Sequence, residues 1–332
     1  MKKAILGLLI SALLIYLSVK DTDFQRVIYG MTKMGYGYIL PFLLIMLLMQ
    51  ALRAWRWGLI LNPLEKIAYL PLFAITSAGF LAITALPARL GELARPYLVA
   101  RKSAIRMSAA VGTIFVERIL DGAAILTIAS ATAFFTILPA WLLKANVIFF
   151  IINLILFSGV FFALFRRPLL LKFLNFSLRI LPEKWPEKWK DALNRLLHHF
   201  LDGFQVIGDG KRLLQILFLS FLIWLIDALA IYILFLAFNF QIPPVAAFVL
   251  MIVLIIGIAI PTAPGFIGNW HFSCVLGLGL FGINKTDALT FAIIYHFLAV
   301  GFVVILGLGF FPSLKLSFAD LRKEARKLSP EF

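Results

Sequence analysis

Residues 213–238 read LLQILFLSFLIWLIDALAIYILFLAF, and this stretch decides the fold class. Asp227 is the single charged residue in the run. An α-helix needs about 20 mainly apolar residues to cross the hydrocarbon core of a bilayer. The stretch therefore predicts a helix that spans a membrane.

Further apolar runs extend this property to the whole chain. Hydrophobic residues make up 62% of the 332 residues and charged residues 14%, whereas about 25% of residues are charged in an ordinary soluble domain. A soluble globule of this composition would expose too much apolar surface to water. We therefore expect an all-α polytopic membrane protein with a single transmembrane domain over 1–332. The other runs are 4–19, 38–52, 67–86, 108–138, 147–165, 245–260 and 288–310.

The positive charge lies mainly between the apolar runs. Segment 166–212 contains ten Lys or Arg residues, and the tail 313–332 is also basic. Cytoplasmic loops carry an excess of Lys and Arg, so both segments, together with 53–66 and 89–106, are expected in the cytoplasm, as are both termini. Segment 166–212 is expected to be an amphipathic connection along the membrane interface. Because no soluble basic domain is present, nucleic acid is not an expected partner.

Loop charge also predicts that two apolar runs turn back inside the membrane. Basic segments flank run 67–86, so it is expected to enter from the cytoplasm, break near Pro87 and return. Weakly charged segments flank run 245–260, so it is expected to enter from outside and break between Pro261 and Gly268. The expected fold is about six full transmembrane helices plus two oppositely oriented re-entrant hairpins, an inverted repeat typical of transporter sites.

The two expected breaks share a short sequence pattern, which weakly supports the repeat. The first is Pro87-x-x-x-Gly91 followed by Glu92, and the second is Pro264-Gly265-x-x-Gly268 followed by Asn269.

Charged residues inside or beside the apolar runs are the candidate site residues, because burying a charge in a bilayer costs several kcal/mol unless it is paired or hydrated. Arg89, Glu92 and Arg95 follow the first break at spacings that place them along one helical stripe. An arginine there could hold a lipid phosphate through two hydrogen bonds. The alternative is a cytoplasmic turn whose arginines reach into the interface.

Run 108–138 contains Glu117, Arg118 and Asp121. Glu117 and Asp121 are four residues apart and share a helical face. Two carboxylates and one arginine leave a net negative group, so we expect another cation to approach, with Arg89 or Arg95 as candidates. A purely structural ion pair and a functional site both remain open for this cluster.

Asp227 is alone near the middle of its run, so it is expected to be protonated or paired. His271, His296 or Tyr295 could be its partner. A proton relay and a structural hydrogen bond are the alternatives. Cys274 is the single cysteine, and the histidines show no metal-ligand spacing beyond the adjacent pair His198 and His199. The sequence also lacks a Gly-rich phosphate loop and a Ser/His/Asp arrangement, so we expect no metal site, no cofactor and no catalytic residue.

Three motifs in order carry a resemblance that covers nearly the whole chain. They are Pro87-x-Arg89-x-Gly91-Glu92-x-x-Arg95, Glu117-Arg118-x-x-Asp121, and Pro261-x-x-Pro264-Gly265-x-x-Gly268. Together they resemble the flippase-like integral membrane family related to the transmembrane domain of lysylphosphatidylglycerol synthases. The chain departs from that family at His271, where an acidic residue is common, and at His296, where a basic residue is frequent.

The resemblance implies translocation of a phospholipid or lipid-linked headgroup, anionic or amine-bearing, between leaflets of a prokaryotic cytoplasmic membrane, and it does not imply aminoacyl transfer. Arginines 89, 95 and 118 would meet phosphate. Glu92, Glu117, Asp121 and Asp227 would balance those arginines or bind an amine. A membrane-embedded glycosyltransferase and an accessory subunit of a glycolipid or envelope pathway are the alternatives. The protein could also form a homo-oligomer or bind an envelope-pathway partner.

Overall fold

The computed structural model describes residues 2–86, 91–165, 187–260 and 262–314. Within these ranges the ordered elements are all helical and no strand occurs, which confirms the predicted all-α class. Several predicted features lie outside the described residues. They are Pro87, Arg89, Pro261, the first part of the connection 166–212 and most of the tail 313–332.

Four helices are long and apolar enough to cross a membrane by length and composition. They are α3 (Ile39–Leu61, preceded by a short turn from Tyr36), α7 (Ala140–Phe165), α10 (Gly210–Ala237) and α13 (Lys285–Phe310). The protein is therefore an integral multi-pass membrane protein. Helix α1 (Lys2–Val19) is shorter, and α6 (Met107–Thr132) carries three charged residues near its centre. The six-span arrangement needs both of these as well, so it stays a prediction.

Two pairs of shorter helices occupy the positions of the predicted hairpins. Helix α4 (Tyr69–Ala85) packs on α5 (Ala94–Lys102), and α11 (Val245–Ala259) packs on α12 (Asn269–Gly279). At 1.5 Å per residue, α4 and α11 are about 25 and 22 Å long, which is less than the roughly 30 Å of a hydrocarbon core. Their lengths fit re-entrant arms.

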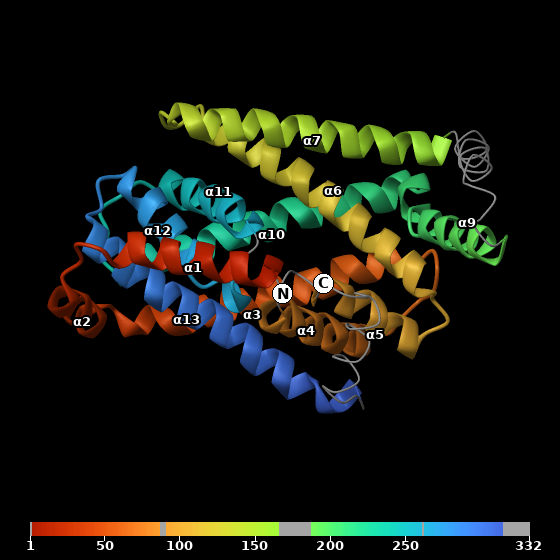
Figure 1. Ribbon diagram of the computed structural model, residues 1–332, viewed down its shortest axis with the longest axis horizontal. Coiled ribbons are helices and arrows are strands. Elements are labelled where there is room, and N and C mark those ends of the chain that lie inside the picture. The colour runs from red at the N-terminus through yellow and green to blue at the C-terminus, as the bar shows by residue number, and fades with distance from the viewer. Residues whose placement is uncertain (1, 87–90, 166–186, 261, 315–332) are drawn as a thin grey trace.

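The two hairpins lie toward opposite ends of the long axis of the molecule. Helices α2 (Phe24–Lys33) and α9 (Glu187–Asp202) mark those ends. In Figure 1 the α11–α12 pair lies in the half with α2, and the α4–α5 pair lies nearer to α9. This placement fits entry from opposite sides, although the re-entrant insertion itself remains a prediction.

The break between α11 and α12 has an unusual backbone. Gly265, Phe266 and Gly268 have φ values of 71°, 59° and 98°, in the region that favours glycine. A Cβ on Gly268 would lie 2.7 Å from the carbonyl oxygen of Ser11 on α1, and the Ser11 hydroxyl accepts a hydrogen bond of 2.8 Å from the Ala263 N–H. Helix α1 therefore packs directly on this tip.

Asn269 closes the same break from within the hairpin. Its side-chain amide donates to the carbonyl oxygens of Gly257 at 3.1 Å and Ile260 at 3.3 Å. These carbonyls belong to the end of α11, where helical hydrogen bonds stop. One buried amide thus joins the last turn of α11 to the first turn of α12.

Gly91, the corresponding glycine of the first hairpin, is needed for a different reason. It has no positive φ, but a Cβ there would lie 2.2 Å from the backbone of Ala82 on α4. The return arm therefore lies directly against α4. The two tips share a sequence pattern, but their glycines have different roles. Those of the second hairpin allow a turn with positive φ, and Gly91 of the first hairpin allows a close approach to α4.

Two local predictions were wrong or incomplete. Helix α3 continues to Leu61, so Arg53 and Arg56 lie within the helix and not in a connection between helices, and the cytoplasmic placement of 53–66 stays a prediction. Their charge suggested a loop, but partners inside the protein keep them in the helix, as described below. The predicted external connection 20–37 contains α2, whose first turn is capped by Asp23 through the N–H groups of Gln25 and Arg26.

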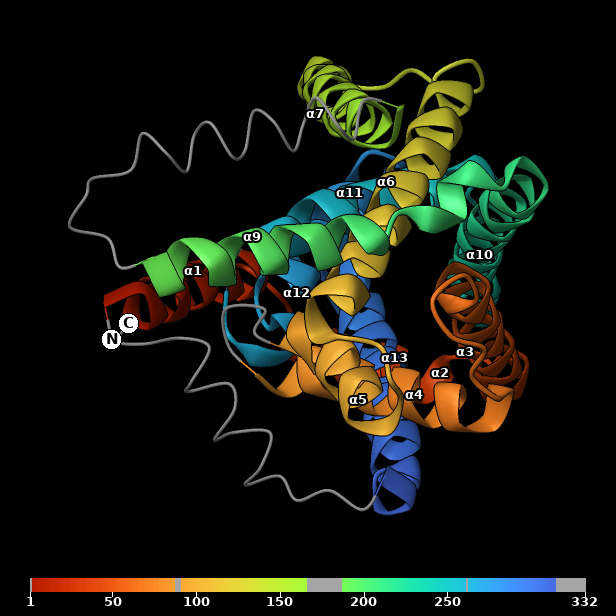
Figure 2. The same cartoon turned by 90° about the vertical axis from the view of Figure 1, so that its right-hand side faces the viewer.

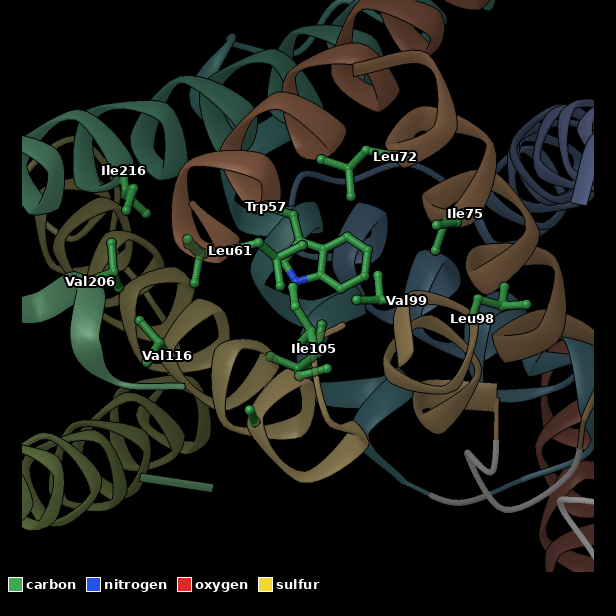
Figure 3. Close-up of a cluster of buried hydrophobic side chains, with 14 of the residues drawn as sticks. Trp57, Leu61, Leu72, Ile75, Leu98, Val99, Ile105, Val116, Val206 and Ile216 are labelled. Carbon is green, nitrogen blue, oxygen red and sulfur yellow. The ribbon is translucent and has the colours of Figure 1, made fainter. Parts of the chain in front are cut away.

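Trp57 anchors the first hairpin to the rest of the molecule. It lies at the centre of a buried apolar cluster from α3, α4, α5, α6 and α10, in which Leu61, Leu72 and Val99 surround the indole (Figure 3). Helix α7 lies at the edge of the molecule and packs mainly on α6 (Figure 2). Helix α6 therefore has close neighbours on most of its faces, and Glu117 and Asp121 face protein.

The close approach at Gly91 gives a testable prediction. Substitution Gly91→Ala should lower the free energy of unfolding by about 1–3 kcal/mol, the usual cost of overpacking, because the backbone of Ala82 cannot move aside without shifting α4. The midpoint of unfolding in detergent micelles, followed by circular dichroism, measures this. Gly279→Ala on α12 is the matched control, because nothing lies within 4 Å of a Cβ there. An equal shift for both variants would contradict the close contact.

Candidate functional site

The candidate site is built on one face of α6. Glu117 and Asp121 are one turn apart and are only 3% and 6% exposed. Helix propensity and the apolar residues around them keep the helix continuous through these charges. The two carboxylates face α3, α5 and α10, and each of these helices supplies a partner. The site therefore lies where four helices meet.

Arg95 on α5 is the partner of Glu117. Its two terminal nitrogens donate to the two carboxylate oxygens, each at 2.9 Å, which is the fork geometry that suits arginine and a carboxylate. The guanidinium also lies 4.2 Å from the centre of the Trp57 ring. On the other side, Gly79 of α4 leaves room for the arginine stem, since a Cβ there would lie 2.2 Å from Arg95 Cγ.

Arg56 on α3 is the partner of Asp121. Its Nη1 donates to Asp121 Oδ1 and its Nη2 to Oδ2 at 3.1 Å. Nη1 also donates to the Ser220 hydroxyl at 2.8 Å, and Trp224 Nε1 donates to Asp121 at 3.1 Å. Arg56 Nη2 lies 3.4 Å from Glu117 as well. The two ion pairs are therefore joined into one network.

We call Arg56, Arg95, Glu117 and Asp121 the charge quartet. All four side chains are buried, and their two positive and two negative charges balance. A buried charge without its partner costs several kcal/mol, so each member holds the others in place. Because both terminal nitrogens of Arg95 are bonded to Glu117, its predicted contact with phosphate would require this ion pair to open.

Arg118, predicted to share the site, lies outside the quartet. It is exposed on α6, and it forms no hydrogen bond or ion pair with any other residue that the structure describes, although it acts electrostatically on Glu117. Asp121, which could have paired with it at i, i+3, bonds to Arg56 instead. Arg118 is about 17 Å from the start of α6 and about 21 Å from its end at 1.5 Å per residue. It is therefore an exposed cation near mid-helix.

Asp227 on α10 has one neighbour that was not predicted, Arg53, beside the predicted Tyr295. Arg53 on α3 acts on it electrostatically, and within the described ranges neither side chain forms a hydrogen bond or an ion pair within 4 Å. Both residues are half-buried. The Arg53 guanidinium lies 5.1 Å from the centre of the Phe80 ring. Tyr295 is near enough to Asp227 to feel its charge.

The two histidines contact each other and do not bond to Asp227, so their predicted pairing with that residue was wrong. The rings of His271 and His296 are 4.9 Å apart. His296 Nε2 donates to the Gly265 carbonyl oxygen at 2.6 Å, since a carbonyl can only accept. His271 Nδ1 is buried without a partner among the described residues. His271 therefore lies in the first turn of α12, and His296 on α13 contacts the tip of the second hairpin.

The remaining predicted residues are placed as follows. Glu92 is half-buried in the turn before α5, and the carboxylate bonded to Arg95 is Glu117 rather than Glu92. Gly91, Pro264, Gly265 and Gly268 lie at the hairpin breaks described above. In the described ranges no group of three or more His, Cys, Asp or Glu side chains could hold a metal ion.

Sequence reasoning missed Arg56, Ser220 and Trp224 as site residues. The position of Arg56 could have been recognised from its surroundings, because an apolar stretch, Trp57-Gly58-Leu59-Ile60-Leu61, continues after it. A cytoplasmic loop would not resume a helical apolar run at once. Ser220 and Trp224 carry no charge, so the sequence offered no reason to single them out.

The quartet predicts strong non-additivity between its members. Arg95→Met should lower the free energy of unfolding by about 3–5 kcal/mol, because buried Glu117 loses the two hydrogen bonds and the positive charge of Arg95. Arg95→Met combined with Glu117→Gln should cost less than the sum of the two single substitutions, since no unpaired carboxylate remains. Unfolding of the three variants in detergent measures the coupling. Arg26→Met, which removes an exposed ion pair to Asp287 of 2.7 Å, is the control and should change stability little. Additive effects would contradict the network.

Comparison with known proteins places the chain in a family. A UPF0104 membrane protein of Methanocaldococcus jannaschii is 28% identical over 225 residues, which is 67% of this chain and 88% of that protein. A UPF0104 membrane protein of Methanothermobacter thermautotrophicus is 22% identical over 296 residues, covering 85% of this chain and 87% of the relative. No solved structure matches. The family model described as the lysylphosphatidylglycerol synthase TM region matches residues 4–307, and the chain therefore belongs to this family of transmembrane proteins.

Proposed function

We propose that the protein is a flippase-like transporter that moves a lipid with a charged headgroup between the leaflets of a prokaryotic cytoplasmic membrane. Arg118 is the observation that carries this proposal. It is exposed near the middle of a 26-residue helix, and no described residue pairs with it. The space beside it therefore has to accommodate a charge.

The cost of an unpaired arginine is the reason why we propose a polar space beside Arg118. A charged side chain at the centre of a bilayer costs about 2.5–3.5 kcal/mol or more if it faces hydrocarbon. Water or a lipid headgroup beside Arg118 removes that cost. A lipid phosphate suits an arginine especially well, because the guanidinium can donate two parallel hydrogen bonds to it. In our proposal the headgroup passes Arg118 while its acyl or ether chains remain in the bilayer.

The hairpins support a translocation path between the two halves. The turn Pro264–Phe266, at the tip of the second hairpin, contacts α4 of the first hairpin. Non-helical backbone at membrane depth persists only where protein buries it or where it lines a cavity. Broken helices at the interface of two repeats are a known location for transporter sites. The meeting point of the hairpins is therefore our candidate for the centre of the path.

Family membership adds a lipid context to these physical arguments. The family takes its description from the transmembrane region of a lysylphosphatidylglycerol synthase, a name that refers to a phospholipid. The two archaeal relatives are named as membrane proteins. Our proposal is transport of such a lipid, with both termini in the cytoplasm.

Lipid translocation by the purified protein in liposomes tests the proposal. Lipids with fluorescent headgroups would be supplied in both leaflets, and a membrane-impermeant quencher would report those in the outer leaflet. Protein that translocates lipid should allow quenching to exceed the one-leaflet limit of about half. Arg118→Gln should abolish most of the excess, because the amide lacks the charge that attracts the phosphate.

Arg26→Gln is the matched control for this experiment. This substitution removes the charge of an arginine at the α2–α13 contact, away from the middle of α6 where Arg118 lies. The variant should translocate lipid like the unchanged protein. Quenching that stays at the one-leaflet limit for anionic, amine-bearing and polyprenyl-linked lipids, with folded protein, would refute the proposal. Full activity of Arg118→Gln would refute the role of Arg118.

A further inference from the structure

We propose that Arg53 and Asp227 form a binding site for a zwitterionic lipid headgroup, one that carries both a phosphate and an ammonium group. The proposed transport function gives this site its purpose, but binding can be measured without transport. Arg53 would bind the phosphate and Asp227 the ammonium. The site is distinct from the charge quartet and from Arg118.

The two residues lie one helical turn from the quartet along two packed helices. Helices α3 and α10 pack together closely. Arg53 precedes Arg56 by three residues on α3, and Asp227 follows Trp224 by three residues on α10. The Gly35 N–H, just before α3, donates to the Ala237 carbonyl oxygen at the end of α10 at 2.7 Å, so the two helices run antiparallel. Because Arg56 and Trp224 both bond to Asp121, Arg53 and Asp227 are displaced from the quartet in the same direction. The α3–α10 contact therefore has two layers of charged residues one helical turn apart, the quartet in one and Arg53 with Asp227 in the other.

The two layers differ in whether their charged groups form ion pairs. In the quartet each arginine donates two hydrogen bonds to a carboxylate and is sealed from solvent. Arg53 and Asp227 attract each other electrostatically but do not meet within 4 Å. Nε of Arg56 and Nε of Arg95 are buried in the quartet without a partner, whereas no polar side-chain atom of Arg53 or Asp227 is both buried and without a partner. The charged ends of Arg53 and Asp227 therefore border accessible space.

An accessible cation and an accessible anion, held apart, are complementary to a ligand with the opposite arrangement. The Phe80 ring beside the Arg53 guanidinium restricts its orientation through a cation–π contact. Arginine suits a phosphate because of its fork of donors, and a carboxylate suits an ammonium. A headgroup with phosphate alone would place its negative charge near Asp227 and would be repelled. This asymmetry selects a zwitterion over an anionic lipid.

Binding of lipids to purified protein in detergent, measured by native mass spectrometry, tests the site without any substitution. The probes are phosphatidylethanolamine, its N-acetylated form, phosphatidylglycerol and diacylglycerol. We expect retention of phosphatidylethanolamine at least about tenfold above each of the others, equivalent to about 1.4 kcal/mol. Equal retention of the N-acetylated form would show that the ammonium is not recognised and would overturn the proposal.

Variants then assign the two contacts to the two residues. Arg53→Gln should reduce retention of phosphatidylethanolamine about tenfold. In Asp227→Asn the carboxylate that repels the anionic N-acetylated lipid and binds the ammonium of phosphatidylethanolamine is gone. This variant should therefore retain the two lipids equally. Arg26→Gln is the charge-matched control and should behave like the unchanged protein. If either site variant fails to fold, the comparison of the four lipids on the unchanged protein still decides the proposal.

The outcomes separate this inference from the proposed function. Selective retention of phosphatidylethanolamine without translocation in liposomes would support the Arg53–Asp227 site and count against a flippase. Translocation together with unchanged lipid selectivity in Arg53→Gln and Asp227→Asn would support the flippase and overturn the site. Retention of phosphatidylglycerol equal to that of phosphatidylethanolamine in the unchanged protein would also overturn it.

Discussion

The fork between Arg95 and Glu117 is the contact on which the arrangement of the first half depends. Both charges are buried inside a membrane protein, and each is tolerated only because the other is present. Arg56 and Asp121 extend the fork so that α3, α5, α6 and α10 share one neutral network. Removing any one charge would leave a net charge where water cannot reach it.

Several features that look unrelated serve this contact. Gly79 leaves space for the stem of Arg95, and Gly91 lets the return arm lie on α4 so that α5 starts in the right place. Trp57 stacks on the guanidinium and donates its indole N–H to Thr113 on α6 at 3.1 Å. The apolar cluster around Trp57 then fixes α5 against α3 and α6 (Figure 3). Packing and electrostatics specify the same geometry.

Sequence alone predicts the helical class well because apolar runs are long and unambiguous here. It also singles out Glu117, Asp121 and Arg95, since charges within or beside apolar runs are rare. It assigns Arg56 to a connection between helices, whereas Arg56 lies within α3, because loop-charge rules count arginines without knowing which have partners. It misses Arg53 as a neighbour of Asp227 for a related reason. Spacing along one helix predicts neighbours on that helix, whereas Arg53 approaches Asp227 from another.

The charges of the quartet are paired and buried, whereas Arg53, Asp227 and Arg118 have no ion-pair partner within 4 Å among the described residues. This difference constrains how a headgroup could pass. Opening the quartet would expose two buried ion pairs at a cost of several kcal/mol each, so α3, α5, α6 and α10 should move as one body. The second hairpin is held differently. Its tip depends on neutral hydrogen bonds from Ala263 to Ser11 and from His296 to Gly265, each worth about 0.5–1.5 kcal/mol. Any movement that admits a lipid is therefore cheapest at that tip, against a first half that the quartet keeps rigid.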